Sequence, residues 1–178
     1  MRTEELKHGH IWLRLSDPKW ENPTDPHHAA QSGGRWNPAG SFDVLYLNED
    51  IVTARLNLQM HVRQWPYEPE DLRPDTAPVL VHCTLPAKQR VLDVHTPKGV
   101  AALGLPASYP LAHNGDLVAH AECQPIGENA RAAGLRGVRS RSAQSPMGAG
   151  RELAWFPATG RSRASVVKTE RFADWFWA

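Results

Sequence analysis

Apolar residues gather in short runs along this chain, and only one segment shows a sustained helical repeat. Residues 44–47, Val-Leu-Tyr-Leu, form an apolar run that predicts a buried strand. A helix is expected next, because apolar residues recur three and four positions apart at Ile51, Ala54, Leu58, Val62 and Trp65. Asp50 is suited to cap this helix and Pro66 to end it. This strand–turn–helix unit is the clearest local prediction in the sequence.

The rest of the chain alternates between short apolar segments and turns. Segments 79–85 and 90–94 predict two strands, and the short turn between them suggests a hairpin. A helix is expected over 124–133, with Pro125 in its first turn and Gly134 at its C-cap. Further strands are expected in three later segments: 137–142, 152–156 and 164–168.

Two long segments lack a clear period. Residues 16–43 are dense in Pro, Gly, Asp, Asn and Ser, which predicts an ordered irregular loop of the kind that often carries function. Residues 95–122 fit a short helix followed by a loop. Short strands interleaved with few helices, and no recognisable linker or repeat, predict one compact α+β domain over residues 1–178. Its core would be a mixed, mostly antiparallel sheet rather than a doubly wound one.

Composition narrows the class of protein. Of the 178 residues, 41% are hydrophobic and 22% charged, which is typical of a globular domain. Twenty basic and nineteen acidic side chains leave a net charge of +1, so nothing favours nucleic acid as a direct partner. Two cysteines are too few for a disulfide scaffold. With no signal-peptide pattern and no apolar run long enough to cross a bilayer, we expect a cytoplasmic protein without membrane contact.

A glycine-rich turn in the irregular segment offers the first candidate chemistry. Residues 32–40 read Ser-Gly-Gly-Arg-Trp-Asn-Pro-Ala-Gly. The glycines allow the backbone to approach a ligand, and Arg35 supplies a rigid fork of donors suited to phosphate or carboxylate. The segment lacks the Gly-Lys-Ser/Thr ending of a P-loop and the Gly-x-Gly-x-x-Gly of a dinucleotide fingerprint. Alone, it also fits an ordinary turn beside a surface arginine.

The order and spacing of several motifs resemble the RES domain family. Gly-Gly-Arg-Trp-Asn-Pro-x-Gly is followed by Val-Leu-Tyr-Leu and then by Thr53-Ala54 at the start of a helix. Arg14, within Ile-Trp-Leu-Arg, matches the arginine that usually opens such domains. The pattern continues in the same order at 123–127, 137–138, 142–143 and 152–156. The resemblance therefore extends from about residue 10 to about residue 168.

This resemblance implies a fold, an activity and a partner. RES proteins are typically toxins of bacterial toxin–antitoxin pairs, with a fold related to ADP-ribosyltransferases. They degrade NAD by hydrolysis or phosphorolysis, or transfer its ADP-ribose to a protein. Their usual partner is an Xre-type antitoxin that covers the active site. NAD is thus the expected substrate or ligand, and an Xre-type antitoxin the expected partner.

The resemblance also assigns roles to residues. The catalytic positions of the family fall on four residues: Arg35, Tyr46, Asn57 and Ser142. Cofactor binding would involve most of these together with Arg14, Gly34, Trp36 and Asn37. Arg14 and Arg35 would pair with the pyrophosphate, Tyr46 would stack on nicotinamide or the base, and Ser142 would hydrogen-bond ribose or the nicotinamide amide. The family places a glutamate where this sequence has Asn57.

The exchange of glutamate for Asn57 changes the expected chemistry. Cleavage of the nicotinamide–ribose bond builds an oxocarbenium-like cation, which a carboxylate stabilises and an amide does not. The loss of such a partner costs about 3 kcal/mol, or roughly a hundredfold in rate. Glu49 and Asp50 precede Asn57 by one to two helical turns and replace the missing charge only if the helix is placed differently.

Two other classes of function stay open. One is a catalytically silent module that binds a nucleotide or an antitoxin, which the presence of Asn57 favours. The other is a metal-dependent hydrolase using histidine-rich spots at 27–28, 82–83 and 120–123, none of which has a typical zinc spacing. We therefore predict no bound metal. Structural roles also fit two of the residues singled out above, Tyr46 as a core residue and Ser142 as a turn residue. Arg139 and Arg141, which alternate with the serines of the same segment, fit side chains that face solvent.

Overall fold

The computed structural model describes residues 1–64, 66, 68–145, 148–159 and 163–178. Its strands are β1 (Thr3–Glu5), β2 (Trp12–Ser16), β3 (Leu45–Asn48), β4 (Val79–Thr84), β5 (Arg90–Val94), β6 (Gly137–Arg141), β7 (Arg151–Trp155) and β8 (Ser165–Glu170). Its α-helices are α1 (His27–Ser32), α2 (Ile51–Val62), α3 (Pro97–Ala101), α4 (His120–Ala132) and α5 (Phe172–Trp175), and a 3₁₀ turn covers Pro69–Asp71. Among these described residues, no helix has both the length and the apolar character that crossing a membrane requires.

The strands form one sheet of eight, in the order β1-β5-β6-β7-β3-β2-β4-β8. All neighbours are antiparallel except β5 and β6. The predicted mixed, mostly antiparallel sheet in a compact α+β domain is therefore confirmed. The strands expected at 44–47, 137–142, 152–156 and 164–168 are present, with boundaries shifted by one or two residues.

The predicted hairpin between the strands at 79–85 and 90–94 is wrong. Both strands exist as β4 and β5, but β6, β7, β3 and β2 lie between them in the sheet. β4 pairs with β2 and β8, whereas β5 pairs with β1 and β6. Each of these strands is hydrogen-bonded to another strand on both sides, so neither has a free edge to pair with the other. A short connection therefore does not imply pairing here, and it joins distant parts of the sheet.

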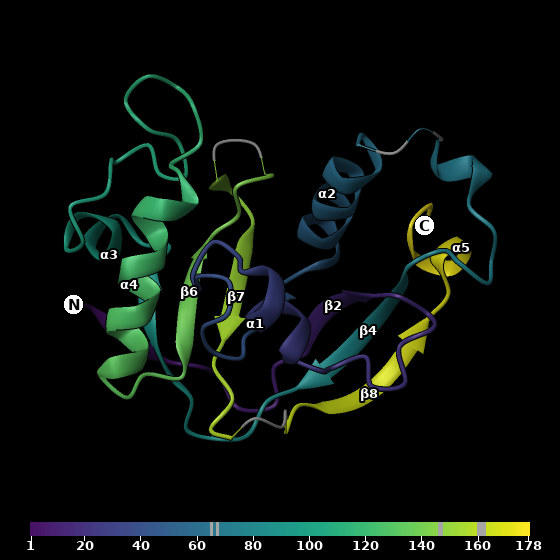
Figure 1. Cartoon of the computed structure of the whole chain (residues 1–178), viewed down its shortest axis with the longest axis horizontal. Helices are drawn as coiled ribbons and strands as arrows, with labels where there is room; N and C mark the ends of the chain where they lie inside the picture. Colours follow the sequence, from purple (N-terminus) through teal and green to yellow (C-terminus); the bar gives the residue numbers. More distant parts are fainter. Residues whose placement is uncertain (65, 67, 146–147, 160–162) are drawn as a thin grey trace.

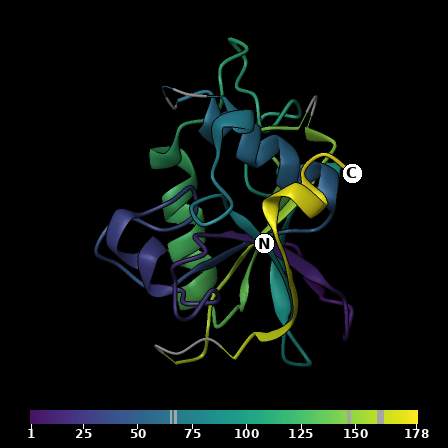
Figure 2. The ribbon, with the colours of Figure 1, turned by 90° about the vertical axis from the view of Figure 1, so that its right-hand side faces the viewer.

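The helices lie at two ends of one sheet face (Figure 1). At one end α4 packs on Leu92, Val94 and Val138. At the other end α2 and α5 pack on Leu13 and Leu80. The opposite face of the central strands carries a separate core that includes Leu45, Leu47, Leu153 and Trp155. The view turned by 90° shows α1 standing apart from the sheet on the side of α4 (Figure 2). Unlike the other helices, α1 therefore lies over the middle of this face, in front of β3 and β7 (Figure 1).

The two long helices begin as local chemistry dictates. The Asp50 side chain accepts a hydrogen bond from the Thr53 amide at 2.8 Å, which caps α2 as expected. Trp65, expected on its apolar face, lies outside the described residues. α4 begins four residues earlier than expected, so Pro125 lies inside the helix and not in its first turn. Gly134 follows the C-cap Ala133 with φ +76°, a conformation that favours glycine.

Irregular structure dominates residues 16–43, with one exception. The short helix α1 forms within this segment, although it has only six residues. Its end is bound to the glycine turn, because the Gly33 amide donates to the Ala29 carbonyl at 3.0 Å. Residues 95–122 contain the expected short helix, α3, followed by turns and an isolated bridge between Leu111 and Leu117. Residues 16–43, with α1, thus lie over the middle of the sheet (Figure 1).

Candidate functional site

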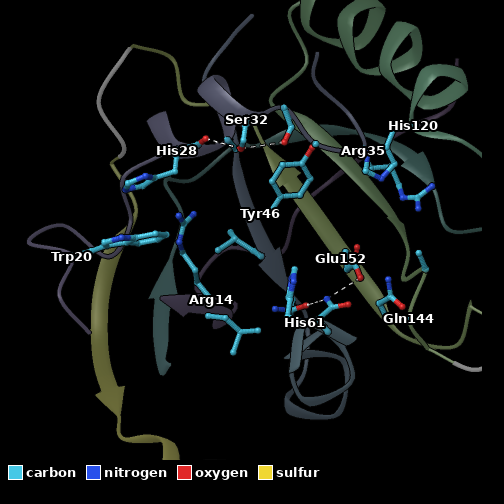
Figure 3. A pocket seen from close by; sticks show the side chains of 18 residues that line it. Arg14, Trp20, His28, Ser32, Arg35, Tyr46, His61, His120, Gln144 and Glu152 are labelled. Carbon is cyan, nitrogen blue, oxygen red and sulfur yellow. Dashed lines mark hydrogen bonds between the residues drawn. The ribbon is translucent and has the colours of Figure 1, made fainter. Parts of the chain in front are cut away.

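A cavity of about 490 Å³ opens between the central strands and the segment that carries α1 (Figure 3). Strands β2, β3 and β7 contribute the residues Arg14, Leu15, Tyr46, Leu47, Asn48 and Glu152. The helices and loops contribute Trp20, His28, Ala29, Ser32, Gly33, Gly34, Arg35, Asn57, His61, His120, Ala143 and Gln144. The volume falls within the range of roughly 300–1,000 Å³ typical of small-molecule sites.

Tyr46 fixes the glycine turn against the sheet. Its hydroxyl accepts a hydrogen bond from the Trp36 amide at 2.9 Å and donates to Asn37 Oδ1 at 2.8 Å. A Cβ on Gly34 would lie 2.4 Å from the same hydroxyl, so this close approach requires glycine. Burial raises the pKa of Tyr46 well above its ordinary value, and the hydroxyl stays protonated. The phenol of Tyr46 therefore links β3 to the glycine turn through two hydrogen bonds.

Helix α4 holds the other side of the turn. Gln124 Nε2 donates to the carbonyls of Gly34 at 3.0 Å and Asn37 at 3.3 Å. Arg35 Nη1 donates to the Val118 carbonyl at 2.8 Å, just before the helix begins. Burial and the nearby Arg35 guanidinium lower the pKa of His120, so this cavity residue is neutral at pH 7. The wall near Arg35 is thus cationic through the guanidinium alone.

Arg14 supplies a second guanidinium, across the cavity from Arg35. The residue is 7% exposed, and burial lowers its pKa to about 10, so it is charged at neutral pH. One Nη2 donates to the Asp25 carbonyl at 3.1 Å, while the buried Nε has no partner among the described residues. An unsatisfied buried donor on a cation is costly. The Arg14 guanidinium lines the cavity and carries its charge there, so it can pair with an anion.

An aromatic pair lies beside Arg14 at the mouth of the cavity (Figure 3). The rings of Trp20 and His28 stack with centroids 4.0 Å apart and an angle of 11°. The guanidinium carbon of Arg14 lies 5.6 Å from the centre of the Trp20 ring. Trp20 is half-buried and His28 is exposed, so this flat surface faces solvent at one end. Such a surface is suited to a planar base.

The floor of the cavity carries a carboxylate. Glu152 Oε1 accepts a hydrogen bond from Asn57 Nδ2 at 2.9 Å, and the same nitrogen donates to Asn48 Oδ1 at 2.6 Å. Asn48 and Glu152 are directly paired across β3 and β7, so their side chains share one face of the sheet. Asn48 Nδ2 donates to the Leu13 carbonyl at 3.3 Å. The three side chains form one connected polar group.

The family model described as RES domain matches residues 11–176. The chain belongs to the RES domain family. Among curated protein sequences, none matches the chain. A chain in the crystal structure of the M. tuberculosis MbcT–MbcA toxin–antitoxin complex superposes with a TM-score of 0.75 at 19% identity, covering 99% of this chain and 92% of that chain. The fold of this RES domain is therefore shared with a toxin–antitoxin component.

The structure brings together five of the residues that the sequence singled out. Arg14, Gly34, Arg35, Tyr46 and Asn57 all line the cavity. Trp36 and Asn37 do not line it, with exposed fractions of 1% and 0%. They act from behind, because the Trp36 amide and the Asn37 side chain hold the Tyr46 hydroxyl.

Ser142 lies just beneath the cavity wall. The residue has no exposed surface, and its hydroxyl accepts a hydrogen bond from the Gln144 amide at 3.2 Å. The next two residues, Ala143 and Gln144, do line the cavity. Ser142 thus orients the segment that presents Gln144 rather than presenting its own hydroxyl.

Sequence reasoning missed several lining residues, above all Glu152. It stands at the start of a predicted strand, between Arg151 and an apolar run, where a charged residue is an ordinary strand end. Whether it faces the core or a cavity depends on the register with β3, which the sequence does not reveal. Trp20, His28 and Gln144 lie in irregular segments whose path depends on tertiary contacts.

Arg139 and Arg141 do not simply meet solvent, contrary to expectation. Arg139 donates to Glu49 at 3.0 Å and to Glu4 at 3.1 Å. Arg141 donates to the backbone carbonyls of His95 and Tyr109 at 3.0 and 2.7 Å. Both side chains tie strands and loops together, because the sheet places each beside acceptors from distant segments.

The histidine-rich spots also have partners within the protein. His27 contacts Asp43 at 3.3 Å, and His82 contacts Glu170 at 2.8 Å. Cys83 and Cys123 are buried free thiols. Burial raises the pKa of Cys83 to about 11, which keeps the thiol protonated. His27, His82 and Cys83 thus have structural contacts, whereas His28 and His120 line the cavity.

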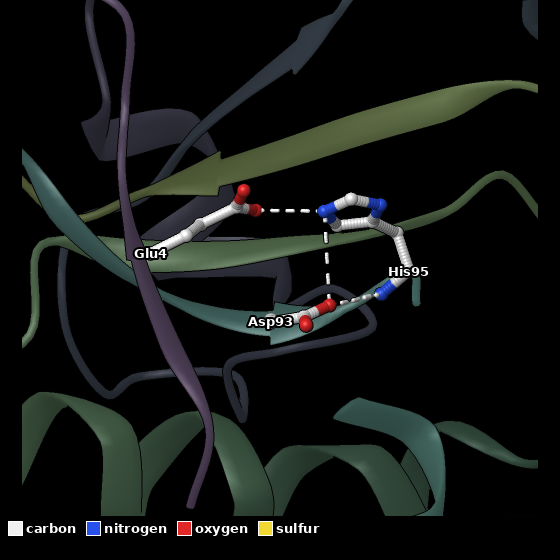
Figure 4. A group of neighbouring side chains, drawn as sticks. All are labelled: Glu4, Asp93 and His95. Carbon is white, nitrogen blue, oxygen red and sulfur yellow. Dashed lines mark hydrogen bonds and ion pairs between the residues drawn. The ribbon is translucent and has the colours of Figure 1, made fainter. Parts of the chain in front are cut away.

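Among the described residues, one group has side chains placed as a metal ion would need them: Glu4, Asp93 and His95 (Figure 4). We call these three residues the edge cluster, since β1 is the outermost strand. His95 Nε2 contacts Glu4 at 2.8 Å. Asp93 accepts hydrogen bonds from the amides of His95 and Thr96 at 3.1 and 2.9 Å, and it pairs with Arg2 at 3.0 Å. Cations and amides of the protein thus already satisfy these carboxylates.

Proposed function

We propose that this RES domain protein binds NAD in the cavity and cleaves the bond between nicotinamide and ribose. The observation that carries the proposal is the cavity itself, which is bounded by two guanidiniums, an aromatic pair and a carboxylate. NAD has complementary parts: an anionic pyrophosphate, a planar base and a ribose that becomes cationic during cleavage.

The pyrophosphate would be held by Arg14 and Arg35. Both guanidiniums line the cavity, and charge-assisted hydrogen bonds to phosphate are about twice as strong as neutral ones. Arg14 keeps its charge at neutral pH, because burial lowers its pKa only to about 10. The pyrophosphate would therefore meet a cation at two places in one cavity.

The two rings of NAD would occupy opposite ends. The stacked Trp20–His28 pair is suited to adenine, because any nucleobase can stack on an exposed aromatic face. Nicotinamide would then lie near the ring of Tyr46, above the carboxylate of the floor. In this orientation the bond to be cleaved lies next to the polar group around Glu152.

A protein antitoxin is the proposed partner, and the cytoplasm the proposed location. The solved neighbour is a component of a toxin–antitoxin complex, and the cavity is open to solvent beside the exposed His28. A partner that covers this mouth would exclude NAD. An Xre-type antitoxin, as the family resemblance implies, is the specific form of this proposal.

The test is a product assay on NAD. Purified protein is incubated with NAD, with and without inorganic phosphate, and products are identified by mass spectrometry. We expect nicotinamide release, together with ADP-ribose when water is the acceptor and its phosphorylated form when phosphate is. Arg35→Ala should abolish release, whereas Arg171→Ala, which removes an exposed arginine, should not. Absence of nicotinamide release at high protein concentration would contradict the proposal.

A second candidate is a RES-fold module that binds nucleotide or antitoxin without turnover. Asn57, at the position of the family glutamate, is the observation that favours it. This module would bind NAD tightly and release no nicotinamide. Calorimetric titration with NAD alongside the product assay separates the two candidates.

A further inference from the structure

Glu152 is the only carboxylate among the described residues that line the cavity. Glu152 lies on β7, and the side chain of Asn57, on α2, donates a hydrogen bond to it. The position on α2 that carries the glutamate in the family therefore carries an amide here, and this amide contacts a glutamate on β7. The cavity thus has one carboxylate, which β7 supplies in place of α2.

The other acidic residues near the start of α2 have different partners. Glu49 makes a two-point contact with the Arg139 guanidinium, at 3.0 and 2.5 Å. Asp50 accepts hydrogen bonds from the amide and the hydroxyl of Thr53 at the helix N-terminus. Neither lines the cavity. They are therefore not available to replace the carboxylate at position 57.

The hydrogen bonds explain why an amide suits position 57. Asn57 Nδ2 has two N–H groups, one directed to Glu152 Oε1 and one to Asn48 Oδ1. This double donation fixes the orientation of the amide. A glutamate at position 57 would bring a second carboxylate to the same place, and two like charges at this distance repel. Glu152 and Asn57 thus form a consistent pair that glutamate at both positions would not.

We propose that Glu152 is the catalytic carboxylate of this protein, acting on the ribose next to nicotinamide, and that Asn57 is its positioning residue. The proposal rests on the proposed function. With this role for Glu152, the chain need not be catalytically inactive, because β7 supplies the carboxylate that α2 lacks. Asn57 is then the departure from the family pattern, and its role is to position Glu152.

The chemistry can be stated for the reaction with water. The bond between ribose C1′ and the nicotinamide nitrogen breaks, and its electron pair stays on nicotinamide, which becomes neutral. The positive charge develops on C1′ and the ring oxygen, where the Glu152 carboxylate stabilises it. A water oxygen forms the new bond to C1′, and its proton is released to solvent. NAD and water give ADP-ribose, nicotinamide and a proton.

The first test compares Glu152→Gln with Glu128→Gln, an exposed glutamate on α4. We expect Glu152→Gln to lower kcat for nicotinamide release about a hundredfold and Glu128→Gln to leave it unchanged. Thermal unfolding and AMP binding of each variant show that the fold and the adenosine end are intact. A wild-type protein that releases nicotinamide, with Glu152→Gln within threefold of it, would overturn the proposal.

The second test is a double-mutant cycle on the pair. Asn57→Leu should lower kcat about tenfold with KM changed less than threefold, because the carboxylate is present but no longer held. In the Glu152→Gln background the same substitution should have no further effect on kcat. Additive losses would mean that Asn57 acts independently of Glu152, and the positioning role would be wrong.

A binding measurement keeps the two proposals apart. Glu152→Ala should lower the affinity for ADP-ribose at least fivefold in calorimetry and leave the affinity for AMP unchanged, because only ADP-ribose has the second ribose. If the wild type releases no nicotinamide, cleavage and the catalytic role of Glu152 are both refuted, and this titration then decides whether Glu152 contacts the second ribose. Equal affinity of both proteins for ADP-ribose would overturn it.

Discussion

The cavity and the edge cluster hold similar kinds of charged groups in opposite ways. In the edge cluster, Asp93 is satisfied by two backbone amides and by Arg2, and Glu4 by His95 and Arg139. In the cavity, Arg14 is 7% exposed and donates to the Asp25 carbonyl, while its buried Nε has no partner among the described residues. A charge with several partners within the protein stabilises the fold, whereas a cation with few partners that lines a cavity is available to a ligand. The two regions thus separate folding from binding within one sheet.

Removal of Asp93 should produce the largest effect, and on stability. Asp93→Ala removes the acceptor for the turn that begins α3 and leaves Arg2 without its partner. Arg2 is half exposed, so the main loss is that of the backbone amides and the Thr96 hydroxyl left without a buried acceptor, and the free energy of unfolding in urea should fall by about 3 kcal/mol. Asp174→Ala, in an exposed pair with Arg171, should have no measurable effect. NAD affinity of folded Asp93→Ala should be unchanged, and a parallel loss of affinity would contradict the division of roles.

Arg14→Met should show the reverse pattern. The substitution keeps an apolar stem of similar length and removes the charge, so NAD should bind about 30-fold more weakly, or about 2 kcal/mol. The free energy of unfolding should stay the same or rise, because an incompletely paired buried cation is gone. Calorimetry and urea unfolding on the same samples check both halves. A variant that is destabilised and still binds NAD normally would place Arg14 among the structural residues.

Trp20→Ala tests the adenine end with a smaller effect. Loss of the stacking surface should weaken the binding of AMP by about 1 kcal/mol, which is five- to tenfold in affinity, and leave the affinity for nicotinamide mononucleotide unchanged. Trp20→Phe should recover most of the affinity, since a phenyl face also stacks. Equal weakening of both ligands would indicate a general change in the cavity, and the proposed orientation of NAD would be wrong.

The smallest effect is expected from pH. Burial alone would raise the pKa values of Glu4 and Asp93, but hydrogen bonds from His95 and Thr96 and the nearby cations outweigh it and hold both below their ordinary values. The unfolded chain then binds more protons than the folded one as the pH falls below about 4.5. Unfolding free energy should therefore decrease below that pH, and less steeply in Asp93→Asn. Identical slopes for the two proteins would exclude Asp93 as a source of acid sensitivity.

Local patterns in the sequence predicted most elements of this fold. The apolar run at β3, the Asp50 cap and the spacing along α2 each depend on neighbouring residues, and all three are present. The hairpin prediction failed because strand pairing is decided by the whole sheet, and β4 and β5 each found two other partners. The start of α4 was also misplaced, because Pro125 is tolerated inside it.

The sequence by itself determined the family, through motifs whose order and spacing do not depend on knowing the fold. It also singled out Arg14, Arg35, Tyr46 and Asn57, which all line one cavity. Only the tertiary structure decided that Ser142 stands behind the wall and that Glu152 faces Asn57. The reason is the register of β3 with β7: a shift of one residue would turn Glu152 to the opposite face, and no local pattern records that choice.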